Sequence, residues 1–221
     1  MTSDTSTCPP LADRITKSLL GYGVIAGPIY VIAVAVQEAT RDGFDPTRHA
    51  ASQLANGDFG WIQTATFFVV GAMTIAAAVG IRRALGAGRA SAWAAGLIGA
   101  YGAGLLAAGV FRADPSDGFP PGTPPGVGAP SWHGIAHFAA AGIGFICLVA
   151  GCFVLASLFA RADERGWAWF SRFAGAFFAA AFAFMASGFG AAILLFTAAV
   201  VVVWAWLTAV SVKLYKAVGN L

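Results

Sequence analysis

Charged residues are scarce in this sequence. Asp, Glu, Lys and Arg make up 10% of its 221 residues, whereas hydrophobic residues make up 58%. Because soluble domains carry about 25% charged residues, this composition excludes an ordinary soluble domain and indicates an integral membrane protein. The net charge of +3 does not indicate a nucleic-acid partner, since the basic residues stand in short segments between apolar runs rather than in one patch.

Cysteine is scarce as well, with three residues in the chain. Cys8 lies in the N-terminal tail, whereas Cys147 and Cys152 are five residues apart within an apolar run. On a helix that spacing directs the two thiols to different sides, so they are not expected to pair. The sequence therefore contains neither a disulfide framework nor a CxxC metal site.

Long uncharged runs are what the sequence does contain. A helix needs about 20 mainly apolar residues to cross a bilayer. The 40 uncharged residues between Arg172 and Lys213 are too many for one crossing, and the SGFG segment, 187–190, is the natural turn. The runs predict six transmembrane helices, at about 18–37, 61–82, 91–112, 132–159, 168–187 and 190–212.

The fold class that follows is an all-α, polytopic membrane protein with one six-helix domain. This domain covers residues 17–216, with short cytoplasmic tails at 1–16 and 217–221. Six crossings place both termini and the second and fourth loops on one side of the membrane. That side carries ten of the thirteen Lys and Arg residues, namely Arg14, Lys17, Arg82, Arg83, Arg89, Arg161, Arg165, Arg172, Lys213 and Lys216. The positive-inside rule then predicts a plasma-membrane protein with both termini in the cytoplasm.

Small residues recur every four positions in two of the predicted helices. One series runs from Ala92 through Gly96 and Ala100 to Gly104, and helix 168–187 contains a similar series. Such spacing lets helix backbones approach closely in lipid. We therefore expect these two helices at the centre of the bundle. The alternative is that the same faces bind a second copy of the chain or another membrane protein.

The two long loops on the other, extracytoplasmic side differ in character. In the first, Asp45 and Pro46 are typical of a helix start and Asn56-Gly57 of a helix end, so we expect a short helix lying along the membrane surface. Ser52 belongs to its predicted polar side. The second loop, 113–131, is rich in proline and glycine and is expected to be irregular.

All three histidines fall on this extracytoplasmic side. Ser131 is a suitable N-cap for the fourth helix, which would place His133 and His137 one turn apart on one face. Asp114 ends the third helix at a similar depth, and His49 lies in the first loop. Two or three histidines with a carboxylate resemble a catalytic zinc site, so these four residues are candidate metal ligands, with Ser52 as an orienting group.

The same residues also permit simpler roles. An HxxxH pair without the glutamate of HExxH specifies no chemistry, and histidine is common at membrane interfaces. We favour a non-enzymatic accessory, binding or transport module that lies in the lipid bilayer and has a polar extracytoplasmic site. One alternative is a membrane-embedded, metal-dependent hydrolase. A second is a haem-binding electron-transfer protein, in which His49 or another subunit would have to face the fourth helix.

Two segments resemble a known family. In 48–85, a histidine and a serine three residues apart lead through Gly-Trp into the second helix, which ends in paired arginines. In 109–145, Asp-Pro closes the third helix and a histidine opens the fourth. This order is similar to the domain-of-unknown-function family 998 of prokaryotic multi-pass membrane proteins. The resemblance implies a six-helix membrane protein and no activity. It also implies that His49, Ser52, Asp114 and His133 are characteristic polar positions.

Overall fold

Six long α-helices make up most of the computed structural model, which describes residues 10–186 and 192–219. They are α1 (Leu11–Thr40), α2 (Gly60–Ala84), α3 (Arg89–Val110), α4 (Trp132–Arg161), α5 (Arg165–Ala186) and α6 (Ala192–Ala217). All six are long and apolar enough to cross a membrane. The prediction of an all-α protein with six membrane-spanning helices is therefore confirmed. The predicted turn at 187–190 lies outside the described residues.

The helices form a ring. Each helix packs against the next along the chain, and α6 packs against α1. The prediction that α3 and α5 lie at the centre is wrong, because α3 packs between α2 and α4 and α5 between α4 and α6. The small residues of α3 serve its two neighbours: Gly102 lies against Gly71 of α2, and Gly104 lies against Gly144 of α4.

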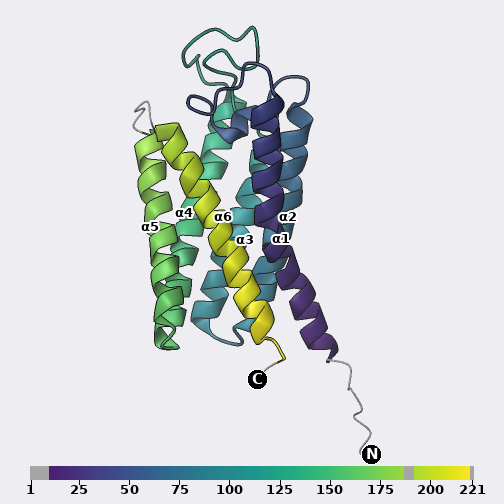
Figure 1. The fold of residues 1–221 in the computed structure, drawn as a ribbon, viewed down its shortest axis with the longest axis vertical. Coiled ribbons are helices and arrows are strands. Elements are labelled where there is room, and N and C mark those ends of the chain that lie inside the picture. The colour runs from purple at the N-terminus through teal and green to yellow at the C-terminus, as the bar shows by residue number, and fades with distance from the viewer. Residues whose placement is uncertain (1–9, 187–191, 220–221) are drawn as a thin grey trace, which may run out of the picture.

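Both ends of the described chain lie at the same end of the bundle (Figure 1). We call this the terminal end. The opposite end carries the segments 41–59 and 111–131 and is called the loop end. The ten basic residues counted above belong to the terminal end, whereas Arg41, Arg48 and Arg112 belong to the loop end. The cytoplasmic location of the termini stays a prediction.

Helices α1 and α6 touch closely only in part of their length. Toward the terminal end, a Cβ added at Gly27 would lie 2.7 Å from Thr208 Oγ1 and 3.0 Å from the Trp204 carbonyl oxygen. The Thr208 hydroxyl donates a hydrogen bond to the Val24 carbonyl oxygen at 3.3 Å. Toward the loop end, α6 runs beside α5 instead (Figure 1). Pro28 lies inside α1, next to this close contact.

Candidate binding cavity

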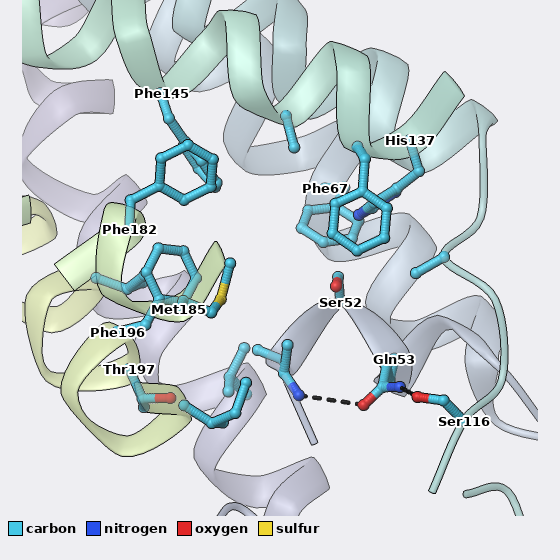
Figure 2. Close-up of a pocket in the computed structure, with 18 of the residues that line it drawn as sticks. Ser52, Gln53, Phe67, Ser116, His137, Phe145, Phe182, Met185, Phe196 and Thr197 are labelled. Atoms are coloured by element: carbon cyan, nitrogen blue, oxygen red, sulfur yellow. Dashed lines mark hydrogen bonds between the residues drawn. The ribbon is translucent and has the colours of Figure 1, made fainter. Parts of the chain in front are cut away.

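A cavity of about 580 Å³ occupies the loop-end half of the ring (Figure 2). All six helices and both loop-end segments contribute lining residues. Pockets that enclose a drug-sized ligand typically measure about 300–1,000 Å³, so this volume suits a small molecule or one lipid chain.

Aromatic side chains form one wall and the floor of the cavity. In the wall, Phe145 of α4 packs against Phe182 of α5 and Phe196 of α6, with ring centroids 5.1 and 5.6 Å apart (Figure 2). At the floor, Tyr30 and Tyr101 line the cavity and pack on the buried Trp204, at 5.2 and 5.8 Å. The deep part of the cavity is therefore largely apolar.

Polar residues line the cavity toward the loop end. Among them are Glu38 near the end of α1, Arg48, and Ser52, whose side chain projects into the cavity from the 3₁₀ helix η1 (Ala51–Ala55) (Figure 2). Arg48 Nε pairs with Asp45 at 3.0 Å. In the described part of the chain, the Glu38 carboxylate has neither a hydrogen bond nor an ion pair. One end of the cavity is therefore polar and the other apolar.

The two loop-end segments are joined to each other by hydrogen bonds from amide side chains. Gln53 Nε2 donates to Ser116 Oγ (Figure 2), and Asn56 Nδ2 donates to the Ala113 carbonyl oxygen at 3.0 Å. Arg41 lies over the ring of Phe119 and donates to the carbonyl oxygens of Leu54 and Asn56. These bonds hold the segments 41–59 and 111–131 together as one cover over the cavity.

The short helix predicted to lie along the membrane surface is not confirmed. Asp45 begins a single turn, because its carbonyl oxygen accepts hydrogen bonds from the amides of Arg48 and His49. Two hydrogen bonds from Thr47 to the Asp45 carboxylate hold the pKa of Asp45 below its usual value. The regular helix that follows is only η1, with Leu54 buried against the bundle. Gln53 of η1 is buried too.

His49 is buried between the loops, with 1% of its surface exposed, and is not among the cavity-lining residues. Its Nδ1 accepts a hydrogen bond from the Asp45 amide at 2.8 Å, which places the ring proton on Nε2. Nε2 then donates to the Asp117 carbonyl oxygen at 3.1 Å. The ring also packs against Phe44 and Phe119. His49 Nε2 therefore joins the two loops, whereas Nδ1 holds the turn that begins at Asp45 within the first loop.

His137 lines the cavity from α4 and is 4% exposed (Figure 2). Its Nδ1 lies 2.7 Å from the Phe111 carbonyl oxygen and 3.3 Å from that of Ala108, at the end of α3. Because a carbonyl oxygen only accepts, Nδ1 carries the proton and Nε2 is left as an acceptor. His137 thus connects α4 to the end of α3 by hydrogen bonds, and its Nε2 is the hydrogen-bond acceptor of this cavity-lining residue.

Asp114 forms the N-terminal cap of α4 together with Ser131. Its carboxylate accepts hydrogen bonds from the Ser131 amide at 2.8 Å and hydroxyl at 2.5 Å. The Ser131 hydroxyl oxygen in turn accepts from the Gly134 amide at 3.1 Å, which confirms the predicted N-cap. A Cβ at position 134 would overlap the carboxylate, so any larger residue there would displace Asp114 from the cap.

His133 faces away from this arrangement. Its side chain is exposed and packs beside Trp132 and Phe111, although it is only one helical turn from the buried His137. The structure therefore brings Ser52, Asp114 and His137 to one cavity and leaves His49 and His133 outside its lining. Across the described residues, no three His, Cys, Asp or Glu side chains are grouped so that they could hold a metal ion.

Several residues of the cavity are not evident as site residues from the sequence alone. Tyr30, Val34 and Glu38 follow one another at four-residue intervals on α1, a spacing that places them on one helix face. This periodicity was the available signal for Glu38. The signal for Tyr101 is weaker, because a single tyrosine in an apolar helix is also compatible with simple packing.

Two cavity-lining residues on α1 and α6 have exposed side chains. Val201 of α6 is 43% exposed, and Ala35 of α1 is also exposed. Both residues line the cavity on the two helices that separate toward the loop end. The cavity therefore lies against the side of the bundle where α1 and α6 separate, and in a spanning protein this side faces lipid.

The polytopic fold and the lateral cavity define the chain as an integral membrane protein with an internal binding-site-sized space. A family model described as "Protein of unknown function (DUF998)" matches residues 24–213, and the chain belongs to this family. Neither a curated protein nor a solved structure matches the chain.

Proposed function

We propose that this protein is a non-enzymatic binding module for a single-chain amphiphile, a molecule with one apolar chain and a small polar head. The cavity carries the proposal, because it is apolar and aromatic at its floor and polar beneath the loops. The chain of the ligand would lie along the wall formed by Phe145, Phe182 and Phe196. Its head would lie near Glu38 and Ser52.

The route of entry follows from the divergence of α1 and α6. The close contact at Gly27 closes the ring toward the terminal end, whereas Ala35 and Val201 leave the lining open at the side. An apolar chain would enter sideways from the bilayer without crossing water. With the termini in the cytoplasm of a plasma-membrane protein, as the charge distribution favours, the ligand would come from the outer leaflet.

The size of the cavity favours one chain over two. About 580 Å³ suits a drug-sized ligand, whereas a two-chain phospholipid would have to leave one of its chains outside in the bilayer.

The candidate metal ligands give less support to a hydrolase. His49 has both nitrogens engaged with backbone groups, and the exposed His133 lies outside the cavity.

Substitution of Gly142 by tryptophan tests this proposal. Gly142 lines the cavity from α4, and a Cβ added there would meet nothing within 4 Å, so the indole can occupy the space without a backbone clash. The matched control is Gly21→Trp on α1, where a Cβ also meets nothing within 4 Å but the residue does not line the cavity. Native mass spectrometry of each detergent-purified protein measures bound lipid-like molecules.

We expect the wild type and Gly21→Trp to retain a single-chain amphiphile and Gly142→Trp to lose it, with all three proteins equally folded by circular dichroism. Equal retention by Gly142→Trp would show that the bound molecule lies elsewhere. Absence of any bound amphiphile from the wild type, even after incubation with hexadecanol, would refute the proposal.

A further inference from the structure

We infer that the head of the preferred ligand is a primary amine and that Glu38 is its counter-charge. This inference rests on the proposed function, since it names the ligand class of the same cavity. The first observation in its support is the charge at the polar end of the cavity. Glu38, Asp114 and Asp117 place three carboxylates in the lining, against the single guanidinium of Arg48.

Glu38 differs from the other charged lining residues because it is unpaired. Asp114 accepts two hydrogen bonds from Ser131, and Asp117 accepts one from the Gly126 amide at 3.1 Å. The Arg48 guanidinium pairs with Asp45. No such partner of Glu38 occurs within the described ranges, 10–186 and 192–219. A partly buried carboxylate without a partner favours a bound cation or hydrogen-bond donor.

Two further features of the polar end favour a cation. Glu38 lies in the last turn of α1, which ends at Thr40, and the C-terminal end of a helix carries partial negative charge. His137 is fixed by the carbonyl oxygens of α3 with its proton on Nδ1, so its Nε2 only accepts hydrogen bonds. A protonated amine supplies three donors and a positive charge. A phosphate head would instead meet three carboxylates and find few donors.

Competition among three ligands with the same chain tests the head. The protein in phosphatidylcholine nanodiscs is labelled with a hexadecanol carrying a photoreactive diazirine on its chain, and the labelled residues are mapped by mass spectrometry. Hexadecylamine, hexadecanol and hexadecyl phosphate then compete for the labelled cavity. The variants are Glu38→Gln and, as a control, Asp58→Asn, which removes an exposed carboxylate at the same end but outside the cavity lining.

In the wild type and in Asp58→Asn, we expect hexadecylamine to compete at a concentration about tenfold lower than hexadecyl phosphate and hexadecanol, which corresponds to one ion pair. In Glu38→Gln, the amine should lose this advantage over hexadecanol, while hexadecanol itself binds unchanged. That unchanged binding shows that the variant is folded.

The outcomes separate this inference from the proposed function. If the probe labels the cavity but the amine competes no better than the phosphate, the amine head is refuted and the binding module stands. The same holds if the amine keeps its advantage in Glu38→Gln. If the probe does not label cavity residues in the wild type, the proposed function itself fails.

Discussion

The terminal-end half of the bundle and the loop-end half are built in different ways. Toward the terminal end, Gly27 of α1 lies against the Trp204 backbone and the Thr208 side chain of α6. Toward the loop end, the same two helices stand apart around a cavity, and hydrogen bonds between loops hold the structure together. Between α1 and α6, one half is closely packed and the other has room for a ligand. Substitutions that add volume should therefore act oppositely in the two halves.

The largest expected effect is that of Gly27→Leu in the closed half. A Cβ there already comes within 3.0 Å of the Trp204 carbonyl oxygen, so the side chain forces α1 and α6 apart. Overpacking of this kind costs about 1–3 kcal/mol. Thermal unfolding in detergent should show a clear loss of stability. Gly142→Leu, which points into open space in the other half, should change stability little; an equal loss would contradict the contrast between the halves.

The stability of the loop-end half should depend instead on buried polar groups such as His49, which makes two hydrogen bonds and two ring contacts. His49→Ala removes two hydrogen bonds and two ring contacts, of which the bond to Asp117 and the contact with Phe119 run between the loops, and it leaves backbone groups without partners. We expect a loss of about 1–3 kcal/mol, measured by unfolding and by faster amide exchange at residues 45–56. The exposed His133→Ala serves as control and should behave like wild type. Similar losses in both variants would mean that burial does not distinguish the two histidines.

Features set by local sequence could be predicted. The six apolar runs gave the six spans, and Ser131 was predicted as the N-cap of α4 because cap chemistry involves residues only three apart. Boundaries are less accurate: the first span is predicted over about 18–37, before the charge of Glu38, whereas α1 covers Leu11–Thr40. A charged side chain near a helix end can reach the interface, so charge alone does not terminate a helix.

Features that depend on how the ring closes could not be predicted. Periodicity placed His133 and His137 on one face, but only the position of α3 decides that His137 is buried and His133 exposed. In the same way, the small residues of α3 indicated close packing without showing that its partners are two neighbours in a ring. The cavity itself follows from the divergence of α1 and α6, which are distant in sequence.

A buried pair of amides between α1 and α2 sharpens the description of the loop-end half. Gln37 Nε2 donates to Gln63 Oε1 at 2.9 Å, while Gln37 Oε1 and Gln63 Nε2 have no partner within the described residues. Gln63→Leu should cost about 1–2 kcal/mol, because Gln37 Nε2 then loses one of its two acceptors and keeps only the Ala33 carbonyl oxygen. The double change to leucine should recover most of this loss. A double variant less stable than both single variants would show that the pair is net stabilising.

The smallest expected effect concerns the cap of α4, where Asp114 and Gly134 form one contact. Asp114→Ala removes both hydrogen bonds to Ser131, and Gly134→Ala displaces the same carboxylate by overlap. Each should cost about 1 kcal/mol, the usual value for a lost cap. Because both changes disrupt one arrangement, the double variant should lose little more than either single variant in urea unfolding. Additive losses would mean that Gly134 is constrained by something other than Asp114, and that the cap and the cavity wall beside it are held separately.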